Sequence, residues 1–145
     1  MTDNELQQRA FERSNPFMYH NFMEIEHVER DLAILRLEVH PESLNPHGMV
    51  GGGLLSALAD NATAEAAHTD GRVYVSQNCS FYFLSNQTDG MIRATARVKR
   101  RGRTTVLVDV EVTGTGDKLL AAGLYSLFCI SEERPTHAET HPIEI

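Results

Sequence analysis

The longest regular pattern of hydrophobic residues in the chain lies between residues 52 and 68. Its apolar residues recur at the three- and four-residue spacing that places side chains on one face of an α-helix. These residues are Leu54, Leu55, Leu58 and Ala62. A loop-like segment, residues 40–49, precedes the pattern, and the Thr69-Asp70-Gly71 breaker follows it. The pattern predicts one long helix over residues 52–68 with this stripe facing the core.

Strand-like segments make up most of the remaining chain. From Phe17 the pattern is extended, alternates over residues 22–26 and turns near residues 29–31. Further segments rich in β-branched and aromatic residues are expected to form strands over residues 33–39, 73–84, 91–101, 104–113 and 118–130. Turn residues rich in glycine and asparagine separate the last four, and we expect the final three strands to form an antiparallel meander.

The order of these elements predicts one domain over residues 1–145. Leu6 and Ala10 mark a short helix over residues 4–14, which Asn15-Pro16 is expected to end. The polar, proline-broken residues 131–145 are expected to form a loosely held extension. One long helix followed by four consecutive strands is typical of an α+β fold in which an antiparallel sheet wraps around the helix.

Charge and composition narrow the classes of function. The net charge of −7 argues against nucleic-acid binding, because phosphate backbones require a basic face. No apolar run approaches the roughly 20 residues of a membrane helix, and the polar N-terminus lacks a signal-peptide pattern, so we expect a cytoplasmic protein that does not bind membranes. Cys79 and Cys129 are expected to be buried thiols without a disulfide.

Basic residues cluster in one short segment. Six of the 13 Lys and Arg residues lie between Arg93 and Arg103, and no acidic residue occurs from Met91 to Val108. This uneven charge indicates a possible local site for an anion.

A glycine-rich turn leads directly into the predicted long helix. Gly51, Gly52 and Gly53 carry no Cβ, so a polarised carbonyl oxygen could approach the unpaired N–H groups at the helix start. Asp60 follows Gly51 by nine residues and lies away from the apolar stripe. Its carboxylate is therefore a candidate functional group, and the alternative is a residue on a solvated helix face.

The segment from Asn45 to Asp60, N-P-H-G-M-V-G-G-G-L-L-S-A-L-A-D, resembles the signature of the hotdog-fold acyl-CoA thioesterases of the phenylacetate-pathway (PaaI-like) type. That family has an Asn, a Gly three residues later, then His-Gly-Gly, and an Asp nine residues after the His. The matching positions are Asn45, Gly48, Gly52, Gly53 and Asp60. Gly51 stands where the family has its His. The resemblance covers about residues 15–130 and implies the hotdog fold.

The resemblance also implies the roles of these residues. The Gly52 N–H, helped by the Asn45 side chain, would polarise the thioester carbonyl in an oxyanion hole. Asp60, ionised at neutral pH, would act either as general base on a water or as nucleophile on the carbonyl carbon. In this family the Asp reaches the site from the partner subunit, which implies a homodimer with shared sites, or a homotetramer built from such dimers.

Other candidate residues lie in the strands after the helix. Ser76 occupies the position where related thioesterases place a Ser or Thr that orients the attacking water. Alternation groups Ser76 with Asn78 and Ser80. The opposite face has Val75, Cys79, Phe81 and Phe83, so a solvated strand face is the alternative for Ser76.

The basic segment from Lys99 to Thr104 resembles the family's hairpin that meets the phosphates of coenzyme A. Its candidate binding residues are Arg100, Arg101, Gly102, Arg103 and Thr104. The alternative is a charged hairpin tip that only keeps a sheet edge soluble.

Histidines give weaker signals. His47, four residues before Gly51, could supply the missing imidazole, although a loop histidine beside Pro46 is more often simply exposed. His137 and His141 have a metal-ligand spacing, but Pro135 and Pro142 flank them and no third ligand is evident. We therefore expect no metal and no prosthetic group, with coenzyme A present only as part of the substrate.

These features predict an acyl-CoA thioesterase that releases a free acid and coenzyme A, with Asp60 driving the attack. The rival is a non-catalytic acyl-CoA binder that keeps the fold and the hairpin without efficient turnover. A hydratase or dehydratase fits less well, because the acid follows the glycines on the helix without a partner His. Asp60 itself discriminates between enzyme and binder, because a pure binder has no chemical need for a carboxylate in mid-helix.

Overall fold

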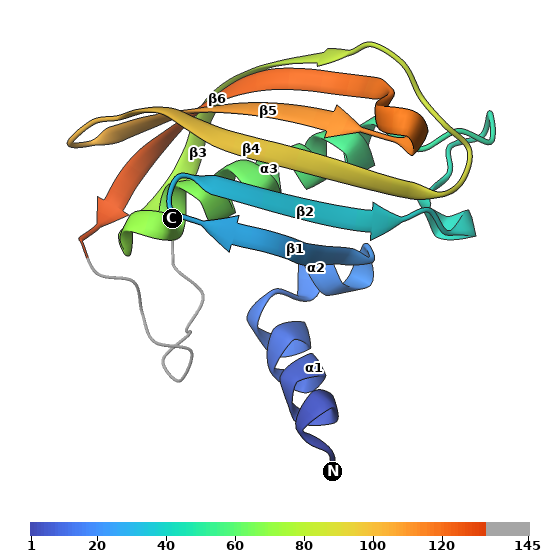
Figure 1. The fold of residues 1–145 in the computed structure, drawn as a ribbon, viewed down its shortest axis with the longest axis horizontal. Coiled ribbons are helices and arrows are strands. Elements are labelled where there is room, and N and C mark those ends of the chain that lie inside the picture. Colours follow the sequence, from blue (N-terminus) through green and yellow to red (C-terminus); the bar gives the residue numbers. More distant parts are fainter. Residues whose placement is uncertain (133–145) are drawn as a thin grey trace.

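An antiparallel sheet curves around one long helix, α3 (Gly52–Ala67), in the computed structural model, which describes residues 1–132 (Figure 1). The strands are β1 (Met23–Glu29), β2 (Leu32–Glu38), β3 (Val73–Phe83), β4 (Met91–Arg101), β5 (Thr105–Thr113) and β6 (Leu119–Ser131). Their order across the six-stranded sheet is β1-β2-β4-β5-β6-β3, with all neighbours antiparallel. The predicted helix and the predicted meander of the last three strands are both confirmed.

The hydrophobic core fills the space between α3 and the concave face of the sheet. On β5, every second residue from Val106 to Val112 is buried, as expected for a strand with one face on the core. On α3 the buried residues include Leu55, Leu58 and Ala62 from the predicted stripe, and Leu54 is half-buried against the same core. Burial of this face holds the helix along the sheet, which fixes the direction of its other side chains.

The N-terminal region contains two helices in place of one. α1 (Asp3–Ser14) begins at Thr2, whose side chain forms a capping box with Glu5, and Figure 1 shows this helix projecting away from the sheet. The expected extended segment from Phe17 is wrong, because Pro16–His20 forms a short helix, α2. Asn15 accepts a hydrogen bond from the Met18 N–H, and Pro16 occupies the first helical position, so the Asn-Pro pair also starts a helix.

Three 3₁₀ turns complete the described chain: η1 (Pro41–Ser43), η2 (His68–Asp70) and η3 (Thr115–Asp117). No helix among residues 1–132 is long and apolar enough to cross a membrane. β6 ends at Ser131, and the extension expected over residues 131–145 lies outside the described residues from 133 onward.

β3 is an edge strand of the sheet, and it carries a bulge that changes which side chains face the helix. Ser76 pairs with Leu127, whereas Asn78 pairs with Ser126 and Cys79 with Tyr125, so Gln77 is the extra residue. Leu127 and Tyr125 lie two residues apart on β6 and share its buried face, so Ser76 and Cys79 also face α3. The expected grouping of Ser76 with Asn78 and Ser80 is therefore wrong.

The two cysteines carry free thiols, and neither is as buried as the sequence led us to expect. Cys79 is exposed on this edge strand, and Cys129 on β6 is half-buried.

Candidate active site

The N-terminus of α3 presents two backbone N–H groups without a partner in the described part of the chain. Gly51 caps the helix: its N–H donates to the Ser43 carbonyl at 2.9 Å, and its carbonyl accepts from the Leu54 and Leu55 N–H groups at 3.0 and 3.2 Å. Within residues 1–132, the Gly52 and Gly53 N–H groups donate to no acceptor. They are positioned to hold an oxygen that carries partial negative charge, at the positive end of the helix dipole.

The Asn45 side chain shapes the loop before α3. The Asn45 Oδ1 accepts hydrogen bonds from the His47 and Met49 N–H groups at 2.9 and 3.2 Å, which folds the segment into a tight turn. Among the described residues, the Asn45 side-chain amide donates to none and remains available to a ligand. His47 is exposed at this turn, and its backbone N–H, not its imidazole, is the group that contacts Asn45.

Asn86 and Gln87 position the peptide that leads into the glycines, a role that was not predicted from the sequence. The Asn86 side-chain amide donates to the Val50 carbonyl at 2.8 Å, and the Val50 N–H donates to the Gln87 carbonyl at 3.1 Å. Both residues lie in the segment expected to be only a turn. An Asn in such a segment is ordinarily a turn former, so its residue type did not distinguish this second function.

The structure brings the candidate residues Asp60 and Ser76, which lie on different elements, into direct contact. The Ser76 hydroxyl donates to the Asp60 Oδ1 at 2.6 Å, across the gap between β3 and α3. Asp60 is half-buried, so its carboxylate also remains accessible. The bulge at Gln77 is the cause of this contact, because it keeps Ser76 on the helix-facing side of an edge strand.

Aromatic side chains line the space between the glycine turn and Asp60. The Phe83 and Phe81 rings lie edge to face at 5.1 Å, and Phe81 lies 6.2 Å from the Tyr125 ring. Phe83 also covers the glycine turn, because a Cβ on Gly52 would lie 3.3 Å from its ring. Burial raises the pKa of Tyr125, and the nearby Cys79 and Asp60 raise it further, so this phenol stays neutral. The result is an apolar wall beside the candidate carboxylate.

The basic hairpin between β4 and β5 contains two kinds of arginine. Arg100 and Arg103 are exposed, and no carboxylate among the described residues pairs with either. Arg101 instead turns inward, where its guanidinium contacts Asp31 and Asp70 at 2.7 Å each and donates to the Ala66 and Ala67 carbonyls at the end of α3. Arg101 therefore stabilises the helix terminus, and we leave it out of the anion-binding site.

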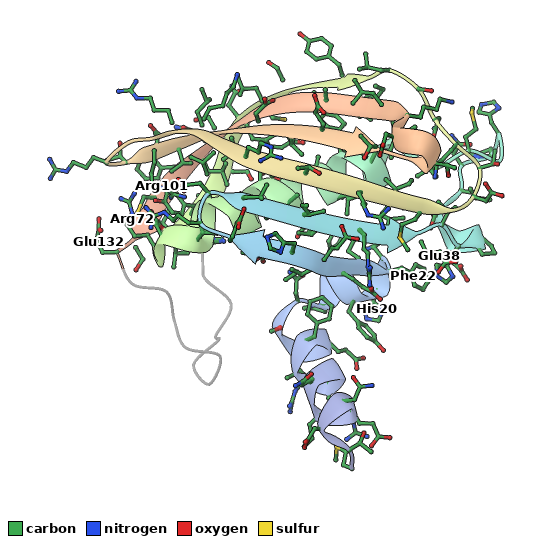
Figure 2. All side chains as sticks on the ribbon, in the orientation of Figure 1. His20, Phe22, Glu38, Arg72, Arg101 and Glu132 are labelled. Carbon is green, nitrogen blue, oxygen red and sulfur yellow. The ribbon has the colours of Figure 1, made fainter. Side chains whose placement is uncertain are left out.

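Arg101 belongs to a cluster of polar side chains at one end of the sheet. Figure 2 shows Arg101 and Arg72 together there, far from His20, Phe22 and Glu38 at the opposite end. The Asp70 carboxylate is the centre of the cluster and accepts hydrogen bonds from Arg72, Arg101 and the Tyr74 hydroxyl. Burial alone would raise the pKa of Asp70, but the hydrogen bonds from Tyr74 and Arg72 and the charge of Arg101 outweigh it and lower this pKa to about 2.

This shift predicts an acid-sensitive contribution to stability. Because the folded pKa lies below the unfolded value of about 3.9, the stabilisation is complete above that value and is lost as the pH falls through about 2. We expect the Asp70→Asn variant to have a lower Tm than the wild type at pH 7 and a smaller loss of Tm between about pH 4 and pH 2. Thermal unfolding followed by circular dichroism measures both, with Asp109→Asn, whose side chain is half-exposed, as the control. If Tm falls by the same amount between pH 4 and pH 2 in all three proteins, the Asp70 carboxylate is not the source of the acid sensitivity.

The described residues contain no cluster of three His, Cys, Asp or Glu side chains that could hold a metal ion. His137 and His141, the pair with metal-ligand spacing in the sequence, lie outside the described residues.

Comparisons with known proteins find relatives of similar sequence. A family model described as "Thioesterase superfamily" matches residues 47–121, from the loop before α3 into β6. The acyl-coenzyme A thioesterase PaaI of Escherichia coli is 31% identical over 100 residues, which cover 68% of this chain and 71% of that protein. A 1,4-dihydroxy-2-naphthoyl-CoA hydrolase of Listeria monocytogenes is 29% identical over 102 residues, which cover 68% of this chain and 82% of that protein.

Solved structures confirm the hotdog fold. The structure of E. coli PaaI, a protein from the phenylacetic acid degradation operon, has a TM-score of 0.80 at 26% identity and covers 87% of this chain and 93% of its own. A putative esterase of Mycobacterium tuberculosis has a TM-score of 0.76 at 28% identity and covers 83% of this chain and 99% of its own.

Proposed function

Because the chain belongs to the thioesterase superfamily, we propose that it is an acyl-CoA thioesterase whose active sites are shared between two copies of the chain. The reaction is hydrolysis of the thioester to a free acid and coenzyme A. The observation that carries the proposal is the hydrogen bond between Ser76 and Asp60. Asp60 lies on the same helix, α3, whose first N–H groups, those of Gly52 and Gly53, have no partner in the described chain.

The spacing along α3 supports a site made by two subunits. Gly52 and Asp60 are eight residues apart on one helix, which corresponds to about 12 Å along its axis. A thioester carbonyl needs an oxyanion donor at about 3 Å from its oxygen and an attacking group at about 3 Å from its carbon. One chain cannot supply both groups to the same carbonyl, whereas the glycine turn of one copy and Asp60 of another can.

The free edge of β3 supports the same arrangement. Tyr82, Phe83 and Leu84 at its end are large apolar residues with exposed fractions between 57% and 64%. An edge strand also leaves backbone groups that a second β3 can pair with. Pairing of two such edges by a two-fold axis gives a homodimer in which each α3 lies beside the partner's β3, and two such dimers give a homotetramer.

In the proposed reaction, Asp60 accepts a proton from a water as the water oxygen bonds to the thioester carbon. The Ser76 hydroxyl, which donates to Oδ1, keeps lone pairs that accept a hydrogen bond from this water and orient it. The carbonyl oxygen becomes an oxyanion held by the Gly52 N–H of the other copy and the Asn45 amide. Cleavage of the C–S bond then releases coenzyme A, and the thiolate takes up a proton. Attack by Asp60 itself through an acyl anhydride remains the alternative route.

The hairpin is the proposed site for the phosphates of coenzyme A. Arg100 and Arg103 supply two exposed guanidinium groups without internal partners in the described chain, and guanidinium matches phosphate geometry. Gly102 and Thr104, which flank Arg103, belong to the same turn. The proposed reaction needs no metal and no prosthetic group, and coenzyme A takes part only as a portion of the substrate.

Removing the Ser76 hydroxyl is expected to slow the reaction without abolishing it. The Ser76→Ala variant loses the hydrogen bond that orients Asp60 and the water, so kcat should fall by about 10- to 100-fold with KM little changed. Steady-state kinetics measure this, and Ser80→Ala on the opposite face of β3 is the matched control. If the Ser76→Ala enzyme has the wild-type kcat, Ser76 has no role in the reaction.

The experiment that tests the function is release of free thiol from a panel of aryl-, short-chain and long-chain acyl-CoAs. We expect at least one of them to be hydrolysed well above the rate without protein. A protein that binds coenzyme A by calorimetry yet releases no thiol from any member of the panel would contradict the proposal and identify a binder.

A further inference from the structure

Arg72 holds the basic hairpin by its backbone. The Arg72 Nη1 donates to the Arg103 carbonyl at 2.7 Å, and Nη2 donates to the Gly102 carbonyl at 3.2 Å. Both acceptors are about 30 residues further along the chain, at the tip between β4 and β5. These contacts therefore join the start of β3 to the hairpin proposed to bind phosphate.

The Arg72 guanidinium is itself fixed in place. Its Nε donates to the Asp70 Oδ2 at 2.9 Å, and the group lies over the Tyr74 ring, with Cζ at 5.2 Å from the ring centroid. Only 17% of the side chain is exposed. Because every nitrogen of the guanidinium is already committed to an internal contact, Arg72 is not available to a ligand and acts through the groups it holds.

Backbone hydrogen bonds also hold the hairpin tip, in addition to the contacts from Arg72. The Thr104 carbonyl accepts from the Cys129 N–H at 2.8 Å, and the Gly102 N–H donates to the Thr105 carbonyl at 2.8 Å. The carbonyls of three consecutive residues, 102–104, are therefore all bonded to the body of the protein. A tip tied in this way holds the Arg100 and Arg103 backbones in one conformation before a ligand arrives.

We propose that Arg72 is a positioning residue for recognition of the coenzyme A phosphates: it clamps the Gly102 and Arg103 carbonyls so that Arg100 and Arg103 form a preordered phosphate site. The proposal rests on the proposed function. A preordered site binds more tightly because less conformational entropy is lost on binding. Arg72 therefore affects only the part of the substrate that carries phosphate, and leaves the thioester chemistry at Asp60 unchanged.

The Arg72→Lys variant tests this, because lysine keeps the charge beside Asp70 but cannot span two carbonyls. Two substrates with the same acyl group are compared: the acyl-CoA and the N-acetylcysteamine thioester, which carries no phosphate. We expect KM for the acyl-CoA to rise about tenfold with kcat unchanged, and kcat/KM for the N-acetylcysteamine thioester to stay at the wild-type value. Arg93→Lys on β4, which loses only an exposed pair with Glu26, is the control and should match the wild type on both substrates.

A second comparison separates the clamp from a general effect on stability. In an Arg103→Gln background, Arg72→Lys should raise KM for the acyl-CoA less than it does in the wild type, because Arg103, whose own carbonyl Arg72 holds, no longer supplies a guanidinium. Arg72→Gln, which is smaller and uncharged, provides a second variant if Arg72→Lys folds poorly. Equal losses on both thioesters, or an unchanged KM for the acyl-CoA in the folded variants, would overturn the proposal.

Calorimetric titration with coenzyme A distinguishes failure of this inference from failure of the proposed function. If the wild type hydrolyses no acyl-CoA but binds coenzyme A about tenfold more tightly than Arg72→Lys does, the clamp stands and the thioesterase proposal fails. If the two proteins bind coenzyme A equally, the clamp is overturned whatever the hydrolysis rate.

Discussion

Replacing Asp60 by asparagine is expected to lower kcat for acyl-CoA hydrolysis by about a thousandfold or more. Asparagine has nearly the same shape, and its side-chain oxygen can still accept the hydrogen bond that Ser76 donates to Asp60. It cannot take up a proton from water or attack a carbonyl at neutral pH. The change therefore removes the chemical role of the carboxylate while it preserves the contact across the gap between α3 and β3.

Thiol release under saturating substrate measures the loss, and calorimetry with coenzyme A should show an unchanged affinity. Asp109→Asn is the matched control, because Asp109 is a half-exposed carboxylate on β5 whose nearest cation, Lys99, lies at 4.0 Å. This control should keep the wild-type kcat. An Asp60→Asn enzyme with more than a tenth of the wild-type kcat would show that another group activates the water.

Dimers of two different variant chains test whether the active site is shared between the two copies. If Asp60 serves the glycine turn of the other copy, a dimer of one Asp60→Asn chain and one Gly52→Pro chain, which lacks the Gly52 N–H, contains one intact site and one that lacks both groups. We expect such a heterodimer, purified with two different affinity tags, to keep about half of the wild-type kcat per dimer. If each site lay within a single chain, both sites of this dimer would lack one group and the activity would be lost.

The long helix and the order of the strands were predictable because most of these elements have a clear hydrophobic period. The helix stripe from Leu54 to Ala62 and the alternating valines of β5 specify one buried face each, and a helix and strands of this kind pack in few ways. The Asn15-Pro16 pair was read as the end of a helix and is also the start of the next, because the same two residues suit both roles.

The site depended on two irregularities that leave no trace in residue type. The bulge at Gln77 moves Ser76 onto the helix-facing side of β3, and a second register shift, between Val98 and Arg100 on β4, turns Arg101 inward opposite Val106. Alternation read from the sequence gives the wrong face beyond such a bulge. It therefore grouped Ser76 with solvent-facing residues and did not separate Arg101 from the free arginines beside it.

The partners of Arg101 could not be found from the sequence either. Asp31 and Asp70 lie 70 and 31 residues away in the chain and approach only when the turn after β1 and the end of α3 are folded.

The absence of a side chain at Gly51, where the family has its His, was visible in the sequence, and the structure does not explain it. Gly51 has a negative φ that any residue can adopt, and a Cβ there would meet only the Ser43 carbonyl oxygen at 3.7 Å, so the fold admits a side chain where this sequence has none.

Replacing Gly52 by proline is expected to lower kcat by about 100- to 1000-fold, because proline removes the backbone N–H assigned to the oxyanion. Gly52 is the first residue of α3, the helical position where proline is best tolerated. The residue before it, Gly51, has φ −59° and ψ 132°, which is the conformation that a following proline favours. The helix should therefore form normally in Gly52→Pro, with a Tm close to that of its control.

The matched control is Gly52→Ala, which adds the same Cβ but keeps the N–H. That Cβ would lie 3.3 Å from the Phe83 ring, which is 57% exposed and can move away, so we expect Gly52→Ala to lose less than about tenfold in kcat. The ratio of kcat values between the two variants then isolates the contribution of one hydrogen bond to the oxyanion. If Gly52→Pro and Gly52→Ala hydrolyse the acyl-CoA equally fast, the oxyanion is held elsewhere, and the unpaired Gly53 N–H becomes the group to test.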